Sequence, residues 1–85
     1  MPEICRFYGI IITMYLPDHN PPHFHVRYNE CRAIIDIKTG HVTGEMPRRA
    51  LNLVFEWLDK HEEELMANWH RMENGETLVT INPLD

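Results

Sequence analysis

Three histidines, His19, His23 and His25, lie close together in the motif His-Asn-Pro-Pro-His-Phe-His. Imidazole is a common metal ligand and titrates near physiological pH, so this spacing suits two kinds of chemistry. The three side chains could bind a divalent metal such as zinc and leave one coordination position open. Alternatively, two of them could act as general acid and general base. Ordinary surface histidines or structural hydrogen-bond partners are the third interpretation, and all three stay open.

Arginine and tyrosine side chains that suit a phosphate group flank this motif in the sequence. With Arg6 stabilising the charged transition state and histidines transferring protons, the set would suit cleavage of an RNA phosphodiester. Arg6, His19, His23 and His25 are therefore the catalytic candidates. Tyr8 and Arg27 would bind the substrate beside them, although any one of these residues could equally belong to an ordinary exposed strand.

A second pair of arginines, Arg48 and Arg49, follows Pro47 in the first turn of a predicted helix. Cations are unfavourable there because the helix dipole is positive at its amino end, so helix stability does not explain them. Together with the N–H groups at the helix start they would bind a phosphate, which makes them further substrate-binding candidates. Solubility, or pairing with Glu45, is the alternative.

The elements that must position the histidines follow from proline and strand geometry. Pro21 and Pro22 restrict the backbone to an extended corner that leads into a strand. Residues two apart in a strand share one face, so His23 and His25 should point the same way, with Phe24 opposite. Whether His19 joins them depends on the path of the chain through the corner.

The rest of the chain predicts more strands, followed by helix. Strand patterns cover residues 4–15 (one strand, or a bent pair interrupted at Gly9), 23–28, 31–37, 41–43 and 78–81. Apolar residues at helical spacing continue from Pro47 to a stop at Asn74-Gly75, with a break near His61. We expect an α+β fold in one domain, residues 1–85. It should have a small antiparallel sheet of about four to five strands, with one long kinked helix or two consecutive helices packed on one face.

Charge and composition narrow the class of protein. The net charge of the 85 residues is −5, but residues 1–49 have a balance of +1 and residues 50–85 a balance of −6. A polyanion would therefore meet the first part, and the overall acidity argues against a general nucleic-acid-coating protein. No apolar run is long enough to span a membrane. Cys5 and Cys31 lack metal-site spacing and read as free thiols, so we expect a cytoplasmic protein with no membrane partner.

Four stretches of the chain resemble one family of small bacterial proteins, domain of unknown function 4160. They are residues 1–10, 18–26, 35–40 and 47–58, of which the histidine motif is the most specific. Cys5 stands where many relatives are expected to have serine. The resemblance implies one half of a two-gene cassette, beside a small protein of the domain of unknown function 2442 family. That pairing suggests a type II toxin–antitoxin system with this chain as the toxin-like component.

The leading hypothesis is thus a cytoplasmic toxin-like protein, an RNA-directed nuclease that uses the histidine corner and is held inactive by an antitoxin-like partner. The resemblance assigns no catalytic residues, so the candidates above rest on their own chemistry. Two alternatives come from other classes: a non-enzymatic protein-interaction or regulatory partner, and a small metal-binding protein. Candidate partners are the antitoxin-like protein, RNA and a second copy of the chain.

Overall fold

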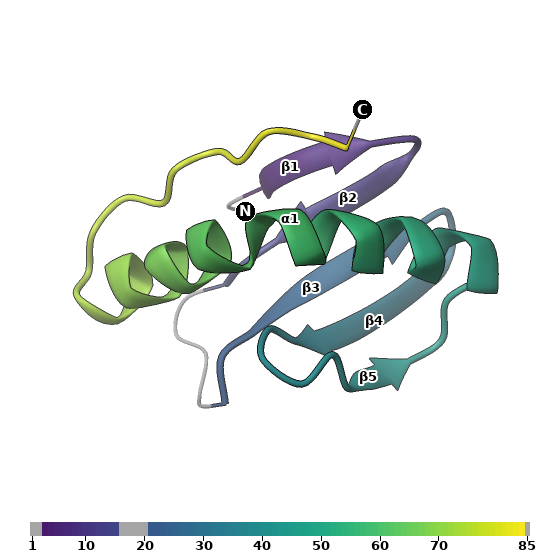
Figure 1. Cartoon of the computed structure of the whole chain (residues 1–85), viewed down its shortest axis with the longest axis horizontal. Coiled ribbons are helices and arrows are strands. Elements are labelled where there is room, and N and C mark those ends of the chain that lie inside the picture. Colours follow the sequence, from purple (N-terminus) through teal and green to yellow (C-terminus); the bar gives the residue numbers. More distant parts are fainter. Residues whose placement is uncertain (1–2, 16–20, 85) are drawn as a thin grey trace.

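A five-stranded antiparallel sheet, covered on one face by a single long helix, makes up the protein (Figure 1). The structure is a computed structural model that describes residues 3–15 and 21–84. The order of the strands in the sheet follows the chain. The elements are β1 (Glu3–Phe7), β2 (Ile10–Thr13), β3 (His23–Tyr28), β4 (Cys31–Asp36), β5 (Val42–Gly44) and α1 (Arg48–Glu73). The α+β expectation is confirmed.

Two-residue turns connect β1 to β2 and β3 to β4. The second is Asn29-Glu30, between the strands predicted for residues 23–28 and 31–37, and Asn29 has φ 54°. The first is Tyr8-Gly9, where both residues have positive φ (49° and 80°), as in a type I′ turn. Gly9 therefore belongs to a hairpin turn between two strands, and the irregular pairing of β1 lies between Glu3 and Cys5 instead.

The core lies between the sheet and α1. Inward-facing strand residues such as Phe24, Val26 and Ile35 alternate with exposed ones, and they meet the helical stripe that contains Trp57 and Trp69. The two tryptophans are at most 1% exposed. Burial of about 150–250 Å² for each ring, at about 25 cal/mol per Å², makes them the main anchors of the helix.

The helix is one element with a kink rather than two helices. Its backbone departs from helical geometry at His61 (φ −127°, ψ 19°), which confirms the predicted break. His61 Nδ1 lies 2.6 Å from Glu64 Oε1. At the carboxyl end the N–H of Glu76 donates to the carbonyl of Arg71 at 2.7 Å, and that of Gly75 to Met72 at 3.2 Å. This pair of bonds is a Schellman motif, so the helix stops where the sequence predicts.

The segment that follows α1 is not the strand predicted for residues 78–81. It runs beside α1 and β1 as an irregular chain (Figure 1), and its one backbone bond to β1 among the described residues joins Ile81 N to Ile4 O at 2.9 Å. Asn68 from α1 takes the place of a neighbouring strand. Its Nδ2 donates to Val79 O at 2.8 Å, and its Oδ1 accepts from Val79 N at 3.0 Å. Side chains rather than a sheet ladder thus satisfy this backbone.

Within the described residues, no helix contains an apolar stretch long enough to span a membrane.

Candidate functional site

The face of the sheet turned away from α1, called the open face here, carries the predicted histidine pair. In β3, Phe24 and Val26 are buried against the core, whereas His23 and His25 are half-buried and Arg27 is exposed. The ring centroids of His23 and His25 are 5.4 Å apart, and the two rings are inclined at 62°. Strand alternation therefore places both histidines on one face with Phe24 opposite, as the sequence predicts.

Strand register gathers three arginines into one line across the open face. Arg6 of β1 pairs with Ile11 of β2, Ile11 with Arg27 of β3, and Arg27 with Arg32 of β4. We call Arg6, Ile11, Arg27 and Arg32 the arginine row. With neighbouring strands about 4.8 Å apart, this row of four positions is about 14 Å long.

A second line lies two residues further along β2, β3 and β4, and it continues onto β5. Thr13 pairs with His25, His25 with Ile34, and Ile34 with Thr43 of β5. These four residues are the histidine row. The rise of a strand sets the two rows about 7 Å apart, so His25 lies beside the centre of the arginine row.

Both rows line one shallow groove with a volume of about 790 Å³. Arg6, His25 and Arg27 were candidates from the sequence and are brought together here. Arg32 was missed. A two-residue turn at Asn29-Glu30 places Arg32 directly opposite Arg27, so the hairpin signal in the sequence was sufficient to find it. The full lining consists of Glu3, Arg6, Ile11, Thr13, Tyr15, His25, Val26, Arg27, Arg32, Ala33, Ile34 and Thr43.

The groove carries an excess of positive charge. Arg6 is bonded to Glu3 through Nε (3.2 Å) and a terminal nitrogen (2.8 Å), and that hydrogen bond is the main reason why the pKa of Glu3 is lowered. Arg27 and Arg32 lie directly opposite each other, an arrangement of like charges that destabilises a sheet. Within residues 3–15 and 21–84, no carboxylate lies within ion-pair distance of either one. An anionic ligand would relieve this repulsion.

His23 lies at the end of the sheet, between His25 and the helix. Its ring is 5.2 Å from that of Trp69, and its Nδ1 is 2.8 Å from Pro21 O. A carbonyl oxygen only accepts, so Nδ1 must carry the hydrogen and Nε2 carries the lone pair of the neutral ring. The His25 ring lies edge-on to Tyr15, with centroids 4.5 Å apart. His25 is thus the histidine that lines the groove, and His23 lies next to it, between His25 and Trp69.

The metal hypothesis depends on His19, which lies outside the described residues. Within the described part of the chain, no group of three or more His, Cys, Asp or Glu side chains is arranged to hold a metal ion. His23 and His25 alone would supply two ligands. Asp36, the cross-strand partner of His23, is engaged elsewhere: its Oδ1 accepts the N–H groups of Thr39 and Lys38 at 2.9 and 2.8 Å.

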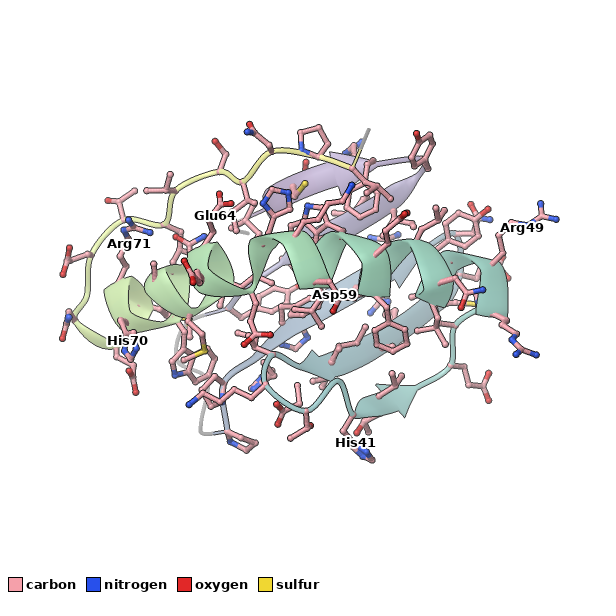
Figure 2. The ribbon with its side chains drawn as sticks, in the orientation of Figure 1. His41, Arg49, Asp59, Glu64, His70 and Arg71 are labelled. Carbon is pink, nitrogen blue, oxygen red and sulfur yellow. The ribbon has the colours of Figure 1, made fainter. Side chains whose placement is uncertain are left out.

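The remaining substrate-binding candidates lie away from the groove. Tyr8, in the β1–β2 turn, and Arg49, at the start of α1 (Figure 2), line a separate hollow of about 640 Å³. Tyr28 also lines this hollow and lies at the opposite end of β3 from His23. Arg48 is exposed beside Arg49. Neither arginine is ion-paired with Glu45 in the part of the chain that the structure describes. The structure therefore does not join Tyr8, Arg48 and Arg49 to the histidine pair.

Comparison with known proteins gives one match. The family model described as "Domain of unknown function (DUF4160)" matches residues 9–70, which include β2 to β5 and most of α1. No curated protein and no solved structure matches the chain.

Proposed function

The chain belongs to the DUF4160 family, and we propose that it is the toxin-like component of a bacterial two-gene module, a cytoplasmic protein that cleaves RNA on its open face. The arginine row beside His25 is the observation that carries this proposal. Two opposed guanidinium groups without a carboxylate partner among the described residues favour a ligand with several negative charges. A phosphodiester chain has such charges at regular spacing.

The histidine pair supplies the proton transfers that phosphodiester cleavage needs. One imidazole removes the proton from a ribose 2′-hydroxyl, whose oxygen then bonds to the adjacent phosphorus. The bond from phosphorus to the 5′ oxygen breaks, and the other imidazole, protonated, donates to that oxygen. The products are a 2′,3′-cyclic phosphate and a 5′-hydroxyl, so no metal or co-reactant is needed.

The distances are compatible with this division of work. Ring centroids 5.4 Å apart leave two imidazoles within reach of opposite sides of one phosphate group, since each must approach its oxygen to about 3 Å. The contact of His23 Nδ1 with Pro21 O at 2.8 Å favours the tautomer in which Nε2 carries the lone pair. Arg27, two residues from His25 on the same face, would stabilise the charge that develops on the phosphate.

The test compares His25→Gln with His70→Gln. His70 is an exposed histidine near the end of α1, and its side chain meets Glu73 at 3.3 Å, so it is a matched control. We expect the wild-type protein and His70→Gln to cleave RNA to cyclic phosphates, and His25→Gln to be slower by about 10²–10⁴-fold. Equal rates for the two variants, or no cleavage by the wild type, would contradict the nuclease proposal.

The toxin-like role rests on the family resemblance and has its own test. Induced expression of the chain should stop growth, expression of His25→Gln should not, and co-expression of the neighbouring antitoxin-like protein of the domain of unknown function 2442 type should restore growth. Unchanged growth on expression of the wild-type chain would contradict the toxin role. A non-enzymatic interaction module is the second candidate, and Ile34 favours it, because this side chain is 38% exposed in the middle of the histidine row.

A further inference from the structure

We infer that the groove binds single-stranded rather than duplex RNA. The bound RNA chain crosses the β-strands, with its phosphates on the arginine row and its sugars and bases on the histidine row. The inference rests on the proposed function and names the substrate class of the same site. It follows from how the two rows differ in chemistry.

All the arginine side chains that line the groove belong to the arginine row. The arginine row provides guanidinium groups on β1, β3 and β4, that is, across about 14 Å of the sheet perpendicular to the strands. A backbone lying along the strands would meet only one of these groups on each strand it followed. A backbone lying across them meets Arg6, Arg27 and Arg32 in turn. The positions of the arginines therefore set the direction of the bound chain.

The histidine row, about 7 Å away, contains polar side chains and one isoleucine, and it has no arginine or lysine. Ile34 is exposed between His25 and the exposed Thr43, and the Tyr15 ring lines the groove next to His25. Aromatic and apolar surfaces bind the faces of unpaired bases, which stacking and pairing hide inside a duplex. A single strand can therefore use both rows, whereas a duplex could use only the first.

The size of the groove and the charge on the opposite side of the molecule also favour single-stranded RNA over a duplex. A recess of about 790 Å³ is in the range of sites that hold small ligands, so it suits a few nucleotides. Beyond the sheet, the solvent side of α1 is acidic, with Asp59 projecting from the middle of the helix (Figure 2). A long duplex that extended around the molecule would meet this repulsion. The exposed acidic residues there are Glu56, Asp59, Glu62, Glu63 and Glu64.

Binding of fluorescently labelled oligonucleotides tests the inference on the full chain. The probe is a ten-nucleotide RNA with 2′-O-methyl groups, which cannot be cleaved, used alone or annealed to its complement. We expect the single strand to bind at least tenfold more tightly. The logarithm of its binding constant should fall with log salt at a slope of about −2, from about 0.7 for each of three arginine–phosphate contacts.

Two double variants with the same change in charge locate the contacts. Arg27→Ala with Arg32→Ala should lower the steepness of that slope by about 1.4. Lys38→Ala with Lys60→Ala, which removes two exposed lysines from outside the groove, should leave it unchanged. An equal effect of the two double variants would overturn the placement of the phosphates on the arginine row.

The outcomes separate the inference from the proposal beneath it. Equal or tighter binding of the duplex would overturn the single-strand inference and leave an RNA-directed function standing. No binding of either oligonucleotide would overturn both. Binding of a polyglutamate peptide as tight as that of the single strand, lost on removal of Arg27 and Arg32, would also overturn both and identify the groove as a docking site for an acidic protein.

Discussion

Asn68 is the buried polar side chain on which the position of the C-terminal segment depends, and Asn68→Ala is the substitution that tests this. The residue is 0% exposed, and its amide bonds to both backbone groups of Val79. Its Oδ1 also accepts from Arg71 at 2.9 Å. Through this contact the segment is held beside β1, the strand that brings Arg6 to the groove.

The expected loss follows from what the alanine leaves behind. Val79 is 50% exposed, so water can reach its freed N–H and C=O, and each lost bond then costs a net of about 0.5–1.5 kcal/mol rather than a full desolvation penalty. Three lost bonds therefore cost about 1.5–4.5 kcal/mol. The higher helix propensity of alanine returns up to about 0.7 kcal/mol. We expect a net loss of about 2–3 kcal/mol.

Urea denaturation followed by circular dichroism measures this loss, and Asn52→Ala is the matched control. Asn52 is exposed on the same helix, so its replacement should be neutral or slightly stabilising. For a chain of this size, 2–3 kcal/mol corresponds to a drop in Tm of about 10–20 °C. If Asn68→Ala were as stable as Asn52→Ala, the clamp on the C-terminal segment would be refuted.

Two further predictions concern the backbone and the acid dependence of stability. Gly44→Ala should lower the free energy of unfolding in urea by about 2 kcal/mol or more, because the φ of Gly44 is 118° and an added Cβ would lie 2.5 Å from Arg32 O. Gly75 is the control: its φ is 73° and the space around it is open, so Gly75→Ala should cost about 1–2 kcal/mol. Equal losses for the two variants would contradict the close approach of Gly44 to Arg32. The pKa of Asp36 is lowered, chiefly by the backbone N–H of Thr39. A carboxyl whose pKa is lower in the folded chain stabilises the fold at pH values above its unfolded-state pKa. This stabilisation is lost as the pH falls through the lowered pKa of the folded state. The difference in unfolding free energy between wild type and Asp36→Asn should therefore be largest near neutral pH and vanish in acid. A difference that does not change with pH would contradict the stabilising role of the Asp36 carboxylate.

Much of the fold follows from local patterns in the sequence. Alternation in β3 and β4 predicts which side chains face the helix, and it places His23 and His25 on one face. The break at His61 and the stop at Asn74 are also local signals, since capping and helix-breaking depend on residues within one turn.

Two features escaped local reasoning because their turn or strand signals are atypical. A type I′ turn usually contains Asn or Asp before Gly, and Tyr8 is an unusual residue at positive φ, so the sequence left open whether residues 4–15 form one strand or the pair of strands that the structure shows. Residues 78–81 have a strand-like composition, but Asn68 satisfies the backbone of Val79 before a sheet ladder can. Composition alone does not reveal which partner a backbone group will find.

The candidate site depends on both kinds of information. The sequence by itself determined that a histidine pair with Arg27 faces away from Phe24, because side chains alternate along any strand. Only the tertiary structure decided that Arg6 joins Arg27 and Arg32 in one row, and that Tyr8, Arg48 and Arg49 lie elsewhere. The physical reason is that pairing register and the path of the helix across the sheet depend on contacts between residues far apart in the chain, and a shift of one residue would move every side chain of a strand to the other face.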